Sequence, residues 1–154
     1  MKVTPISGLA GTFVFFGLAV WILTRAFYGQ MGPISARATL TLWFLAVVCA
    51  VLSWRVRDRK SSGKIGMDRS QLSPLAAANF LVIGKASAWT GAIVGGAYAG
   101  IAAHILPHYN QLTAAAADTP GVLSGALAGL AVTVAGVVLE RSCQVPPPAD
   151  GEAA

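Results

Sequence analysis

The sequence predicts an all-α integral membrane protein, a four-helix bundle with both termini on the cytoplasmic side. The composition is the first observation: apolar residues make up 55% of the 154 residues and charged residues only 11%. An ordinary globular domain carries about 25% charged residues. The second observation is that the apolar residues gather in four long runs, near 6–24, 38–54, 80–106 and 121–139. Each run is close to the roughly 20 residues that cross a bilayer.

Helix-capping signals set the expected bounds of the four helices. A hydroxyl residue followed by proline favours the first turn of a helix. This pair occurs at Thr4-Pro5, Ser73-Pro74 and Thr119-Pro120, and Ser35 is a candidate cap for the second helix. The predicted helices span about residues 5–25, 36–55, 74–106 and 120–140. They form one transmembrane domain, 1–145, followed by a disordered, proline-rich and acidic cytoplasmic tail, 146–154.

Basic residues are concentrated between the second and third apolar runs. This segment carries six of them: Arg55, Arg57, Arg59, Lys60, Lys64 and Arg69. The second outer loop, 107–120, has none. Because basic flanks stay in the cytoplasm, we expect a multi-pass protein of the cytoplasmic (inner) membrane with both termini inside.

Two roles stay open for this basic loop. The simpler interpretation is that it only fixes the topology. The loop could also bind anionic lipid headgroups, at roughly 1 kcal/mol per basic residue, or recruit a partner. Since the charge is local to the loop, the net charge of +5 does not indicate nucleic-acid binding.

Small residues recur at every fourth position of the third run. One row contains Ser87, Gly91, Gly95, Ala99 and Ala103, and a second row beside it contains Ala88, Ala92, Gly96 and Gly100. The fourth run offers Gly121, Gly125, Gly129 and Thr133. Such spacing lets helix backbones approach closely in lipid. We expect one row to pack the third helix on the fourth. The second row is left open between packing within the chain and a surface for self-association or a membrane-protein partner.

Lys85 is the only ionisable residue well inside a predicted span. A lysine at the centre of a membrane helix costs about 2.5–3.5 kcal/mol, and less near an end. Our first interpretation is an intramembrane ion pair with Glu140, at the inner end of the fourth helix. Snorkelling of the lysine to the headgroups comes second, and substrate binding third.

The chain offers little for catalysis or metal binding. His104 and His108 are four residues apart, a spacing that can hold a metal on one helical face. Pro107 disturbs that turn, and only Asp118 or Tyr109 offers a further ligand, so no metal site is predicted. No serine–histidine–acid set and no paired acids occur. We therefore expect no catalytic residues, no cofactor and no enzyme activity.

Three short phrases carry a family resemblance. They are RAFYG at residues 25–29, KASA at 85–88 and LERSCQVPPP at 139–148. Together with the four spans they resemble an uncharacterised actinobacterial family of membrane proteins, domain of unknown function 3180. The resemblance covers nearly the whole chain and implies a four-helix membrane protein, with no established activity to carry over.

Two functions fit these observations. The first is a non-enzymatic accessory or scaffold subunit that acts through helix–helix contacts and the basic loop. The alternative is a small oligomeric transporter or channel with Lys85 lining the path. A proton-coupled carrier normally needs an acid within the membrane core, and every acid is predicted outside it, which favours the first.

Overall fold

The computed structural model describes residues 4–30, 32, 36–61 and 74–143, and this part of the chain contains helices and no strand. The four long helices are α1 (Ile6–Phe27), α2 (Leu40–Ser61), α3 (Pro74–Ile105) and α4 (Thr113–Ser142). Short 3₁₀ turns are η1 (Tyr28–Gln30), η2 (Ala36–Thr39) and η3 (Leu106–His108). All four long helices are long and apolar enough to cross a membrane. The predicted fold class, all-α with four membrane-spanning helices, is therefore confirmed.

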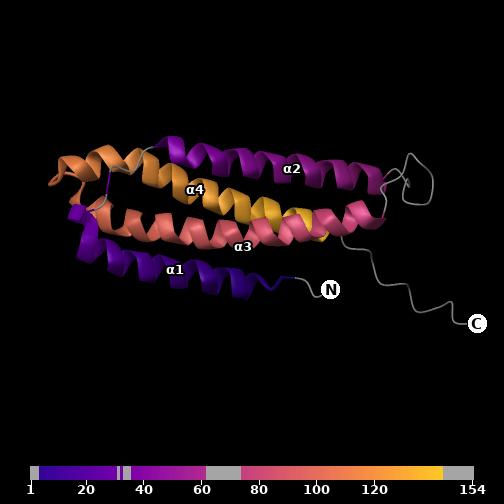
Figure 1. Cartoon of the computed structure of the whole chain (residues 1–154), viewed down its shortest axis with the longest axis horizontal. Helices are drawn as coiled ribbons and strands as arrows, with labels where there is room; N and C mark the ends of the chain where they lie inside the picture. Colours follow the sequence, from indigo (N-terminus) through magenta and orange to yellow (C-terminus); the bar gives the residue numbers. More distant parts are fainter. Residues whose placement is uncertain (1–3, 31, 33–35, 62–73, 144–154) are drawn as a thin grey trace, which may run out of the picture.

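The helices lie side by side in the spatial order α1, α3, α4, α2 (Figure 1). α3 and α4 form the central pair, α1 packs on α3, and α2 packs almost entirely on α4. Among the described residues, the α1 backbone does not come close to that of α2 or α4. The arrangement is thus an open row rather than a closed bundle in which every helix has two neighbours.

Burial follows this order. Only 6% of the most apolar stretch of α1 is buried, compared with 39% in α4. Large apolar side chains such as Phe15, Phe44 and Leu127 are well exposed. Lipid tails are as apolar as leucine, so a bilayer covers these side chains without a protein neighbour.

α4 begins seven residues before the predicted start. The sequence analysis used Thr119-Pro120 as the start, but the helix begins at Thr113 and Pro120 lies inside it. Thr119 is not a cap, since its hydroxyl donates a hydrogen bond to the Ala115 carbonyl one turn earlier, at 2.6 Å. The run of four alanines at 114–117 explains the extension, because alanine is the strongest helix former.

The predicted cap of α1 is also wrong. Pro5 occupies the N-cap position, and no side chain caps the helix. The Thr4 hydroxyl is buried and has no hydrogen-bond partner among the described residues. The backbone N–H of Thr4 is used instead, as shown below. The other two predicted caps, Ser35 and Ser73, lie outside the described residues.

Candidate functional site

The most extensive helix contact joins α3 and α4, and glycines form it. A Cβ added at Gly91 would lie 2.6 Å from the backbone nitrogen of Thr133, and one at Gly95 would lie 3.1 Å from the backbone of Gly129. At such distances only hydrogen fits without moving the neighbouring helix. The structure therefore places the row with Gly91 and Gly95 against α4.

Two further glycines, absent from the predicted packing set, extend this interface. A Cβ at Gly84 would lie 2.8 Å from the backbone nitrogen of Glu140, and one at Gly136 would lie 2.5 Å from the α3 backbone. The sequence signal for them was a spacing of seven residues, two helical turns, before Gly91 and after Gly129. The four-residue rows did not include it.

The second row of α3 packs within the chain, against α1. A Cβ at Gly96 would collide with the carbonyl oxygen of Phe13, and one at Gly100 would collide with that of Gly17. Ala92, in the same row, is almost fully buried. The second row is therefore a packing surface within the chain, and α1 covers it.

The other predicted packing residues are enclosed less closely by backbone. A Cβ at Gly125 would meet the ring of Tyr98, at 2.6 Å. Ser87 in α3 and Gly121 in α4 are buried, whereas Ala99 is half-buried. These positions fill the central layer without setting the helix separation.

Lys85 and Glu140 form no ion pair in the described part of the chain. The Glu140 side chain is 2% exposed and its Oε1 accepts a hydrogen bond from the Thr4 backbone N–H at 2.8 Å. The physical reason is helical phase. Gly84 faces the backbone of Glu140, so Lys85, about 100° further around α3, points elsewhere and stays partly exposed.

A second polar group lies where α1 ends and α4 begins. The Tyr28 hydroxyl donates to Asp118 Oδ2 at 3.2 Å, and Asp118 is 7% exposed. The ring of His104 contacts Tyr28 and lies 5.1 Å from that of His108, centroid to centroid. His108 Nδ1 lies 2.9 Å from the His104 carbonyl oxygen. No three potential ligands come together for a metal among the described residues.

The predicted basic loop is described only at its start. Arg55 and Arg57 lie on α2 and are exposed. Arg57 Nε donates to the Ser142 hydroxyl at 3.1 Å, which joins the ends of α2 and α4. The side chains of Arg59 and Lys60, and the whole of Lys64 and Arg69, lie outside the described part.

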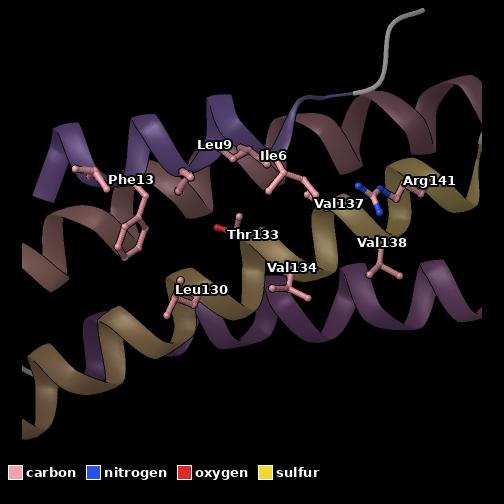
Figure 2. Close-up of a pocket in the computed structure, with 12 residues that line it drawn as sticks. Ile6, Leu9, Phe13, Leu130, Thr133, Val134, Val137, Val138 and Arg141 are labelled. Atoms are coloured by element: carbon pink, nitrogen blue, oxygen red, sulfur yellow. The ribbon is translucent and has the colours of Figure 1, made fainter.

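A groove of about 500 Å³ opens between α1 and α4 (Figure 2). Ile6, Leu9 and Phe13 line one wall, and the α4 residues line the other: Leu130, Thr133, Val134, Val137, Val138 and Arg141. Ala92 of α3 contributes to the lining between the two helices. A second hollow of about 380 Å³ shares Phe13 and Val14 with the groove and continues along α1 to Trp21.

The chain matches a known protein family from within α1 to beyond the end of α4. The model of a family described as a protein of unknown function, DUF3180, matches residues 9–147. The chain belongs to this family. No curated protein and no solved structure matches it.

The DUF3180 match includes the helix interfaces and most of the groove. All of α2, α3 and α4 lie within it, and so does the α3–α4 glycine interface. Of the residues that line the groove, only Ile6 lies before the matched range. The helix interfaces and the groove are therefore part of the DUF3180 domain itself.

Proposed function

We propose that this DUF3180 chain is a non-enzymatic accessory or scaffold subunit of the cytoplasmic membrane, which acts through helix–helix contacts. The proposal rests on Gly11 of α1. Glycine inside a helix costs about 1 kcal/mol relative to alanine, so each helical glycine needs a reason to be there. For the other helical glycines whose surroundings the structure describes, the reason is close packing against a neighbouring atom.

Gly11 stands apart from the other glycines of the long helices. Wherever the structure describes the surroundings of such a glycine, a Cβ would meet a neighbouring atom within 4 Å, except at Gly11, where it would meet nothing. Gly11 is exposed. It lies about 200° around the helix axis from Leu9, which is buried together with Ala88 and Ala92 of α3. α1 forms one flank of the row, and no other described helix covers that flank (Figure 1). Gly11 is thus an unfilled notch in a surface that otherwise contacts lipid.

The residues around Gly11 suit a docked helix. Ser7 lies one turn earlier on the same side and is exposed. Small residues four apart allow the backbone of a second transmembrane helix to approach closely. The exposed rings and chains of Phe15 and Leu18 continue the same side and would flank the docked helix.

The charged residues bear on the orientation. Six basic residues, at the end of α2 and in the segment that follows it, favour a cytoplasmic location for that segment and for both termini.

Two of the described acids are buried, Asp118 and Glu140. They lie towards opposite ends of α4, about 33 Å apart along the axis. Each accepts a hydrogen bond, and this wide separation supports a role without a shared catalytic centre.

Photo-crosslinking in native membranes tests the proposal. Benzoylphenylalanine replaces Phe15, on the Gly11 side of α1, or Phe44 of α2, which is matched in type and is 70% exposed. We expect a discrete crosslinked product from position 15 and only lipid adducts from position 44. Gly11→Leu should abolish the product and Gly11→Ala should largely keep it. Equal products from both positions, or a product that survives Gly11→Leu, would contradict the proposal.

A further inference from the structure

The groove between α1 and α4 combines apolar walls with an exposed arginine, Arg141, at one end. We propose that it binds an anionic phospholipid, with acyl chains along α1 and the phosphate on Arg141. The lining is apolar apart from Thr133 and Arg141. The Thr133 hydroxyl already donates to the Gly129 carbonyl at 2.8 Å. A ligand in the groove thus meets hydrocarbon along its length and a charge at one end.

The dimensions of the groove suit acyl chains. Its α1 wall runs from Ile6 to Val14, which is about 12 Å at 1.5 Å per residue. Its volume of about 500 Å³ is within the range of small-molecule sites, about 300–1,000 Å³. Flexible acyl chains can follow such an apolar groove along the helix.

The continuation of the groove suits the length of a lipid. The second hollow shares Phe13 and Val14 and reaches Trp21. From Ile6 to Trp21 the two hollows follow α1 for about 22 Å. The acyl chains can therefore lie against the protein well into the bilayer from the end that carries Arg141.

Arg141 supplies the specificity for an anionic headgroup. Its side chain is exposed at the end of α4 and makes no hydrogen bond or ion pair with any described residue. The adjacent carboxylate of Glu140 is buried and accepts from the Thr4 N–H, and it forms no ion pair with Arg141 among the described residues. A planar guanidinium matches two phosphate oxygens at once. Figure 2 shows Arg141 beyond Val138, at the end of the apolar wall.

This site is separate from the helix-docking notch. Neither Gly11 nor Ser7 lines the groove or the second hollow. Of the residues placed around the notch, Leu18 borders the second hollow but not the groove that carries Arg141. The lipid site therefore stands even if no partner helix binds at Gly11, and the two proposals can fail independently.

Native mass spectrometry of the purified full chain in mild detergent tests lipid binding. Dioleoyl phosphatidylglycerol and dioleoyl phosphatidylcholine are titrated separately. We expect tighter binding of phosphatidylglycerol, and Arg141→Gln should weaken it about five-fold, the effect of one basic side chain at a lipid surface. Binding of phosphatidylcholine should not change. Arg141→Lys should keep most of the preference, which separates loss of charge from misfolding.

Two matched controls locate the site. Arg57→Gln removes another arginine at this end of the helices, whose side chain donates a hydrogen bond to the Ser142 hydroxyl, and should leave the preference intact. Ala10→Phe fills the groove and should lower binding of both lipids, whereas Ala26→Phe, exposed on α1 outside the groove, should not. Equal losses in the two arginine variants would overturn the proposal, and so would unchanged binding in Ala10→Phe.

Discussion

Glu140 is a buried acid held by a backbone donor from the other end of the chain. Its carboxylate accepts from the N–H of Thr4, which directly precedes α1. A proline follows Thr4 and the helix has no side-chain cap, so this bond fastens the start of α1 to the end of α4. A single side chain thereby joins the two helices that otherwise meet only across the groove.

The Glu140 bond gives a prediction at the residue scale. Glu140→Ala leaves the buried Thr4 N–H without an acceptor and should cost about 1–3 kcal/mol of stability. Glu140→Gln keeps an acceptor oxygen and should cost less. Thermal unfolding in one detergent measures both variants, and amide exchange at Thr4 should rise in Glu140→Ala. Equal stability of the alanine variant and the wild type would mean that the bond contributes nothing.

The same variants test the predicted ion pair with Lys85. Since the two side chains form no ion pair among the described residues, Lys85→Met combined with Glu140→Ala should have additive effects within about 0.5 kcal/mol. A coupling energy well above that value would restore the pair. The sequence could place both residues near the same end of their helices. It could not fix which face of α3 meets α4, because that depends on the phase of the Gly84 contact.

At the scale of elements, the sequence predicted the helices better than their ends. Four spans follow directly from long apolar runs. Their bounds agree to within four residues except at the end of α2, which lies six residues later than predicted, and at the start of α4. At α4 the preference of proline for the first helical turn predicted the wrong start, because the alanine run before Pro120 extends the helix. The small-residue rows also predicted which parts of α3 pack closely. They could not show that the second row belongs to α1, since helix order is a property of the whole chain.

Glycine-to-alanine changes test the helix contacts with opposite expected signs. Gly91→Ala places a methyl group against the Thr133 backbone nitrogen and should destabilise the protein by about 1–3 kcal/mol, as overpacking does. Gly11→Ala has open space and should stabilise α1 by up to about 1 kcal/mol through helix propensity. Thermal unfolding of the purified monomer in detergent measures both. The same sign for both variants would refute the assignment of these two surfaces.

At the scale of the molecule, the open row exposes both flanks to the bilayer. Among the described helices, α1 packs on α3 alone and α2 packs almost only on α4. Composition and apolar runs predicted that the helices cross a membrane, but lipid and protein neighbours satisfy an apolar face equally well. For that reason neither an open row nor the groove could be derived from hydropathy. The Thr4–Glu140 contact was likewise hidden, because its donor is a backbone group.

The orientation of the row is tested by cysteine labelling in intact cells. Both native cysteines, Cys49 and Cys143, are buried and should react little. Ser62→Cys, in the basic segment, should be protected from an impermeant thiol reagent. Gln111→Cys, exposed between α3 and α4, should react. Labelling at Ser62 with protection at Gln111 would invert the proposed topology.

The open row also constrains how the protein is made. Chain synthesis delivers the N-terminal segments first, so α1 and α2 enter the bilayer before α3 and α4 exist. Neither of the early helices packs on the other, and each native neighbour is synthesised later. The first half of the chain therefore lies in the membrane as two separate helices until α3 is made. α3 then packs on α1, and α4 packs on both α3 and α2. Assembly is complete only when translation reaches the end of α4.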